Sequence, residues 1–153
     1  MIQRIQSLYL LTASILLALA LFMPWISFFG QEGELYQLKA FQVEQILGQG
    51  AQAFSFWALG ALLIIAAALS FVGIFLFKNR PLQSRFCIFN AILLIGFYLV
   101  FLIFMLYARK SLDASLGLNF GLALPLIALI LNFMALRAIN KDEALVQSYH
   151  RLR

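Results

Sequence analysis

The sequence predicts an all-α integral membrane protein with four transmembrane helices, and three observations support this fold class. The 153-residue chain is 64% hydrophobic and only 11% charged, with a mean hydropathy of +0.96. Soluble proteins are roughly 45–50% apolar and about 25% charged, so this chain lacks the polar residues needed to cover a globule in water. It also contains four long apolar runs, and the charged residues lie between these runs or near the chain ends.

The four runs cover residues 8–29, 53–77, 86–107 and 116–136, and none contains Asp, Glu, Lys or Arg. A helix that spans a membrane needs about 20 mostly apolar residues, and each run is long enough. An open sheet would leave unpaired backbone groups in hydrocarbon, and the runs lack the alternation of a membrane β-barrel. The start of the first run resembles a signal peptide, but the chain stays apolar beyond it, which favours an uncleaved helix. We therefore expect a single four-helix membrane domain over residues 1–153.

The segment between the first two runs, residues 30–52, is the only outside segment with room for structure of its own. Every second residue from 35 to 43 would lie on one face of an extended strand, and residues 26–29 offer a partner strand. This pattern favours a short extracytoplasmic β-hairpin between the first and second helices. The alternative is an amphipathic interfacial helix over residues 41–47.

Basic residues in short flanking segments predict the orientation, because Lys and Arg are retained in the cytoplasm. With the N-terminus inside, eight of the eleven Lys and Arg residues fall on the cytoplasmic side. Among them, Lys78, Arg80 and Arg85 hold the loop between the second and third helices on that side. We therefore expect a multi-pass protein with both the N- and C-termini in the cytoplasm.

Two amide side chains lie toward the cytoplasmic ends of the third and fourth runs. Asn90 and Asn132 are each five residues from the nearest basic residue, Arg85 and Arg137. At about 1.5 Å of rise per residue, both amides lie roughly 7–8 Å inside the cytoplasmic boundary. Because polar side chains commonly join membrane helices, we expect an interhelical polar pair, formed directly or through one water. A substrate or lipid-headgroup site is the functional alternative.

Two glycines have the spacing of a helix-packing motif. Gly117 and Gly121 form a GxxxG pattern in the fourth run. This spacing lets two membrane helices approach closely. We expect helix packing at these positions, against either a neighbouring helix of the chain or a partner subunit.

The C-terminal residues 137–153 are polar and contain neither Gly nor Pro, which predicts a cytoplasmic helical tail that continues the fourth helix. Asp142 is expensive to embed in hydrocarbon, so the chain should leave the bilayer before it. Leu145, Tyr149 and Leu152 share a narrow apolar stripe. We expect this stripe to dock the tail against anionic lipid or a partner subunit.

Residues that support catalysis are sparse. His150 is the only histidine and Cys87 the only cysteine, so a haem or zinc site lacks partners. No Asp, Glu, Lys, Arg or His lies within the apolar runs to relay protons, and no Gly-rich phosphate loop is present. The net charge of +5 is spread over several loops, whereas nucleic-acid surfaces gather it on one face. We therefore expect no enzyme activity, no catalytic, cofactor or metal residues, and no nucleic-acid partner.

Three segments carry a family resemblance: MIQRIQ at the start, KNRPLQSR in the middle and KDEALV near the end. Through them the chain resembles the domain of unknown function 4293 family over essentially its whole length. The resemblance implies a small four-helix protein of the bacterial inner (cytoplasmic) membrane, from Bacteroidota. The family's function is unassigned, so the resemblance supplies no catalytic residues.

The long aromatic-rich helices and the small outside segment favour an interaction protein. We expect a non-catalytic subunit, or an assembly or stabilising factor, of a larger inner-membrane complex. Its partners would be membrane lipids and other membrane-protein subunits. The alternative is a small transporter or a lipid-binding homo-oligomer.

Overall fold

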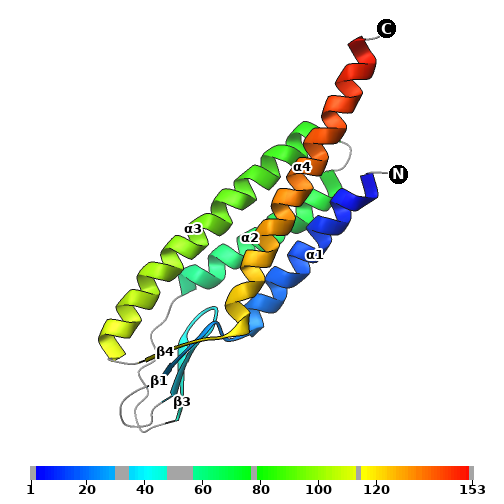
Figure 1. Cartoon of the computed structure of the whole chain (residues 1–153). Coiled ribbons are helices and arrows are strands. Elements are labelled where there is room, and N and C mark those ends of the chain that lie inside the picture. Colours follow the sequence, from blue (N-terminus) through cyan, green and yellow to red (C-terminus); the bar gives the residue numbers. More distant parts are fainter. Residues whose placement is uncertain (1–2, 30–34, 48–56, 77–78, 113–114, 152–153) are drawn as a thin grey trace.

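Four long helices run side by side, and a small sheet covers one end of them (Figure 1). The computed structural model describes residues 3–29, 35–47, 57–76, 79–112 and 115–151. Within these ranges the helices are α1 (Gln3–Phe22), α2 (Trp57–Phe75), α3 (Arg80–Leu112) and α4 (Ala123–Arg151). Each is long and apolar enough to cross a membrane. The predicted four-helix membrane protein is thus confirmed.

The helices pack in a ring, in which α1 contacts α2 and α4, and α3 also contacts α2 and α4. Both chain termini lie at one end of this bundle, and the sheet lies at the other (Figure 1). We call these the terminal end and the sheet end. Because α4 continues as helix to Arg151, its C-terminal end extends beyond the rest of the bundle (Figure 1).

The sheet is antiparallel and draws strands from two separate loops. Its strands are β1 (Ile26–Phe29), β2 (Leu35–Leu38), β3 (Val43–Leu47) and β4 (Ser115–Leu118), in the spatial order β3-β2-β1-β4. The predicted hairpin is confirmed, because β1 pairs with β2 in a register that sets Ile26 against Leu38.

The details of this loop differ from the sequence prediction in two ways. Residues 35–43 do not form one strand, because the chain turns at Lys39, whose N–H donates to the carbonyl oxygen of Gln42 at 3.0 Å. The alternative of an interfacial helix over residues 41–47 is wrong, since Val43–Leu47 is strand β3.

Two of the predicted spans are too long at the sheet end. The first apolar run continues to residue 29, but α1 ends at Phe22 and Pro24 follows, which cannot extend the helix. The fourth run begins at residue 116, but residues 115–118 are strand β4 and α4 starts at Ala123. Strands that pack against a bundle are as apolar as the helices, so hydropathy alone does not separate them.

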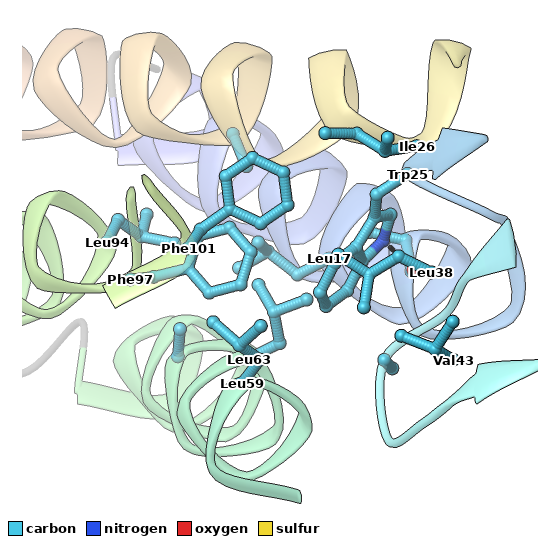
Figure 2. Close-up of a cluster of buried hydrophobic side chains, with 14 of the residues drawn as sticks. Leu17, Trp25, Ile26, Leu38, Val43, Leu59, Leu63, Leu94, Phe97 and Phe101 are labelled. Atoms are coloured by element: carbon cyan, nitrogen blue, oxygen red, sulfur yellow. Dashed lines mark hydrogen bonds between the residues drawn. The ribbon is translucent and has the colours of Figure 1, made fainter. Parts of the chain in front are cut away.

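Trp25 fills the junction between the bundle and the sheet (Figure 2). Its ring is fully buried, and its Nε1–H donates to the carbonyl oxygen of Ala20 at 2.8 Å. The ring meets Phe97 of α3 edge-on, with 5.3 Å between centroids. Around it pack Leu17 of α1 and Leu59 of α2. The interior at this end is therefore a continuous apolar core that joins helices and sheet.

Candidate functional site

Buried polar side chains gather at the terminal end of the bundle, where they link all four helices. We call this set the polar layer; its members are Gln6, Ser70, Gln83, Asn90, Asn132 and Asp142. In the low-dielectric interior an unpaired polar group is costly, so each member is expected to find a partner on another helix. Four hydrogen bonds between helices satisfy the side-chain amide donors of this layer.

Two contacts join α2 to α3. The Asn90 side chain donates from Nδ2 to the hydroxyl oxygen of Ser70 at 2.8 Å. The Gln83 side chain donates from Nε2 to the carbonyl oxygen of Gly73 at 3.0 Å. Both donors lie on α3 within two turns of each other, so they fix the lateral and axial position of the two helices.

Within the polar layer, one contact joins α4 to α3. The Nδ2 of Asn132 donates to the backbone carbonyl oxygen of Cys87 at 2.7 Å. The predicted direct hydrogen bond between Asn90 and Asn132 is therefore wrong, because each amide group donates elsewhere. The Oδ1 atoms of both residues are buried and accept no hydrogen bond. The water-mediated form of the pair stays a prediction.

A fourth contact joins α1 to α4 and was missed by the sequence reasoning. Gln6 donates from Nε2 to Oδ2 of Asp142 at 2.6 Å. We expected Asp142 to lie beyond the bilayer, but its side chain is only 7% exposed and is covered by the protein. Since 136 positions separate the two residues, no local pattern in the sequence could reveal this pair.

Two grooves open on the surface at the terminal end. The α1–α4 groove has a volume of ≈ 430 Å³ and is lined by apolar Ile5 and Met134 together with Tyr9, Arg137 and Lys141. Ala138 and the buried Asp142 complete its lining. The α2–α3 groove, of ≈ 360 Å³, is lined by Leu69, Arg85, Phe86 and Phe89. Each groove therefore combines apolar walls with at least one cation.

A comparison with known families assigns the chain. The family model described as Domain of unknown function (DUF4293) matches residues 2–152. The chain belongs to this family. No curated protein matches the chain. The resemblance seen in the sequence is therefore confirmed.

The three basic residues predicted to orient this DUF4293 protein lie close to the start of α3 in the sequence. Arg85 is exposed and lines the α2–α3 groove. Arg80 is the first residue of α3, while Lys78 lies outside the described residues, as does the Arg80 side chain. The carbonyl oxygen of Asn79 accepts from the N–H groups of Leu82 and Gln83, which starts the helix.

The predicted helix-packing glycines of this DUF4293 protein do not lie on a long helix, so that prediction is wrong. Gly117 lies in β4, and Gly121 lies in the short 3-10 helix η2 (Phe120–Leu122). Gly121 is nevertheless a close-packing site, because a Cβ there would lie 2.4 Å from the carbonyl oxygen of Pro24. Its lack of a side chain lets η2 rest on the connection between α1 and β1.

The tail of this DUF4293 protein is helical to Arg151. The predicted docking stripe falls outside the described residues at Leu152, and so do the side chains of Leu145 and Tyr149. The docking role therefore stays a prediction.

Proposed function

We propose that this protein is a non-catalytic subunit or stabilising factor of a larger complex in the bacterial inner membrane. The observation that carries the proposal is a patch of exposed apolar side chains beside an unpaired strand edge at the sheet end. The unpaired strand edge is the part of this surface that fits another protein better than it fits lipid.

The patch, here called the rim patch, consists of Phe22, Met23, Leu118 and Phe120, whose exposed fractions are 81%, 44%, 74% and 86%. Phe22 ends α1 and Met23 follows it, while the other two residues flank Asn119. The N–H of Asn119 donates to the carbonyl oxygen of Trp25 at 3.0 Å, which draws the two segments together. Exposed apolar surface that is gathered in one place commonly marks an interaction site.

Strand β4 gives the rim patch a second property. In the part of the chain that the structure describes, β4 is the last strand on its side of the sheet, so its outer backbone edge pairs with no other strand. Hydrocarbon does not tolerate unpaired backbone groups, and water does not favour a side chain as apolar as Leu118. A partner protein that supplies an extended segment would form hydrogen bonds with the β4 edge and would cover the Leu118 side chain.

The support beneath the rim patch is held by several hydrogen bonds. Asn119 donates from Nδ2 to the hydroxyl oxygen of Ser27 at 2.8 Å. The hydroxyl of Tyr98, on α3, donates to the carbonyl oxygen of Leu122 at 2.9 Å. A surface that is ordered before binding loses less conformational entropy when a partner arrives. This favours a role as a fixed platform in an assembly.

The orientation that goes with this proposal places both termini in the cytoplasm. Eight of the eleven Lys and Arg residues belong to the terminal end by sequence, and basic residues are retained on the cytoplasmic side. The rim patch then faces the opposite side of the inner membrane, where it meets extracytoplasmic parts of a partner.

A photo-crosslinking amino acid tests the proposal in native membranes. Placed at Leu118, it should crosslink to a different membrane protein that also co-purifies stoichiometrically in mild detergent. The matched control is Leu99, which is 60% exposed on α3 and lies within the candidate span; it should crosslink to lipid alone. Crosslinks from position 118 to a second copy of this chain, with lipid co-purifying, would instead support the lipid-binding homo-oligomer.

A further inference from the structure

The α1–α4 groove combines two helix faces at the terminal end. On α4, its lining residues Met134, Arg137 and Lys141 recur at i, i+3 and i+7. On α1, Ile5 and Tyr9 recur at i and i+4. Residues with these spacings lie on one face of a helix. The groove is therefore a regular feature of how the two helices pack.

The groove is graded along the helix axis from charged to apolar. Arg137 and Lys141 lie about 6 Å apart along α4, and Met134 lies about 4.5 Å further toward the middle of the membrane. Both cations are exposed. Ile5 begins the candidate span of α1 and Lys141 lies near the end of that of α4. The cationic part of the groove therefore coincides with the level at which the spans end.

One acidic residue, Asp142, also lines this groove and contributes to its net charge. Asp142 accepts a hydrogen bond from Gln6, and its side chain is buried beside the cations. Two cations, Arg137 and Lys141, against one carboxylate leave one net positive charge in the lining. A single phosphodiester would balance that charge.

We propose that the α1–α4 groove binds one phospholipid with an anionic headgroup, from the leaflet on the side of the chain termini. Its phosphate lies between Arg137 and Lys141, and one acyl chain runs from there over Met134 toward the middle of the membrane. Two interactions favour this lipid, because the charge attracts the headgroup and the apolar wall of the groove packs against the acyl chain. A soluble anion would use only the first of these. The proposal is independent of the partner-protein role, which concerns the opposite end of the molecule.

Native mass spectrometry of the full-length protein in detergent tests the proposal. The probes are phosphatidylglycerol and phosphatidylcholine with identical acyl chains, added in equal amounts. We expect one phosphatidylglycerol per chain to bind more tightly than phosphatidylcholine. Removing either cation, as Arg137→Gln or Lys141→Gln, should weaken that binding about fivefold, and removing both should weaken it about 30-fold.

Two further variants separate this groove from general surface charge. Arg85→Gln removes one cation from the α2–α3 groove and leaves the α1–α4 groove intact, so tight phosphatidylglycerol binding should be unchanged. Ala138→Phe keeps every charge but fills the groove, since Ala138 lines it, and should reduce binding at least as much as the double Gln variant. If Ala138→Phe does not fold, the two single Gln variants, which change exposed side chains, still decide the question.

Three results would overturn the proposal. One is equal affinity for the two phospholipids. Another is equal loss of binding in Arg85→Gln and Arg137→Gln. The third is full competition by glycerol 3-phosphate, which has the anionic group without acyl chains and would make the groove a site for soluble anions.

Discussion

The side-chain amide of Asn132 is bonded to the backbone of Cys87 and not to its thiol. The donor Nδ2 lies 2.7 Å from the Cys87 carbonyl oxygen. Because the acceptor belongs to the main chain, α4 is joined to α3 whatever side chain stands at position 87. Replacing Cys87 by Ala should therefore preserve this contact, which gives a cysteine-free background for other experiments.

The amides of Asn90 and Asn132 are predicted to be coupled through one water. Both Oδ1 atoms are buried without a hydrogen-bond partner, and buried polar groups of this kind commonly bind an ordered water. A water that donates one hydrogen to each oxygen joins the two residues. We therefore expect Asn90→Leu and Asn132→Leu together to destabilise the protein less than the sum of the single effects, each about 0.6–2 kcal/mol. Unfolding of the two single variants and the double variant in a denaturing detergent measures this coupling. Single effects that add within about 0.5 kcal/mol would contradict a bridging water.

Gln6→Leu is predicted to destabilise the contact between α1 and α4. The change removes the donor that lies 2.6 Å from Oδ2 of Asp142 and leaves the buried carboxyl group with one partner fewer. Loss of a partner of a buried polar group costs about 1–3 kcal/mol, and the free energy of unfolding should fall by this amount. Ser84→Ala is the control, because it removes an exposed hydrogen bond to Asn140 and should change stability by less than about 0.5 kcal/mol. Equal effects of the two changes would contradict the importance of the buried pair.

Gly121→Ala is predicted to loosen the sheet from the bundle. The new Cβ would lie 2.4 Å from the carbonyl oxygen of Pro24, so the backbone must move, at a cost of about 1–3 kcal/mol. Gly96→Ala is the matched control, because a Cβ there meets no atom within 4 Å. That change should be neutral or stabilise α3 by up to about 1 kcal/mol. Thermal unfolding followed by Trp fluorescence compares them, and equal midpoints would argue against a tight contact at Gly121.

The ion pair of Lys39 and Glu44 predicts a small pH dependence at the sheet end. Their charged atoms lie 2.5 Å apart, and Gln42 donates a second hydrogen bond to the carboxylate at 2.7 Å. The hydrogen bonds from Lys39 and then Gln42 hold the pKa of Glu44 below its ordinary value of 4.5. A lowered pKa in the folded state adds stability that is present above pH 4.5 and disappears as the pH falls through the lowered value.

Glu44→Gln should remove this pH dependence and leave the stability at neutral pH almost unchanged. Both side chains of the pair are more than one-third exposed, so water and salt screen their interaction. Stability measured in a pH series on both sides of pH 4.5 tests the prediction. An unchanged acid dependence in the variant would assign it to another carboxyl group.

The predicted orientation can be tested with single cysteines in the Cys87→Ala background. Asn79, at the terminal end, and Ser115, at the sheet end, are both exposed in the structure. In intact cells an impermeant thiol reagent should label Ser115→Cys and spare Asn79→Cys until the membrane is opened. The reverse labelling would invert the orientation and leave the helix bundle unchanged.

The sequence predicts the helices better than their ends because hydropathy reports burial and lipid contact but not backbone conformation. The four spans follow directly from apolar runs without charges. Residues 26–29 and 115–118 are apolar for another reason, since they form strands that pack at the end of the bundle. The hairpin partner of β2 was readable from alternation, but β4 comes from a distant loop and leaves no local pattern.

For the two asparagines of the polar layer, the sequence predicts that the side chains are buried but not which partners they bind. The depth of Asn90 and Asn132 follows from their distance along the helix, and both are indeed buried. Their partners depend on how each helix is rotated about its axis and how it is set against its neighbours, which tertiary packing decides. The bond from Asn132 to a backbone carbonyl is invisible to any pattern of residue types, and the glycine spacing of Gly117 and Gly121 was misread because a strand interrupts it.

The place of β4 in the sheet has a consequence for biosynthesis. Strand β1 lies between β2 and β4, and Asn119, next to β4, bonds to Ser27 across 92 positions of the chain. Synthesis delivers the N-terminal part first, so β1 leaves the ribosome long before its second neighbour. During that interval one side of β1 stays open to aggregation. In the orientation proposed above, the sheet closes only after the last loop has been translocated, and a chain arrested after α3 exposes a strand edge to chaperones and proteases on that side.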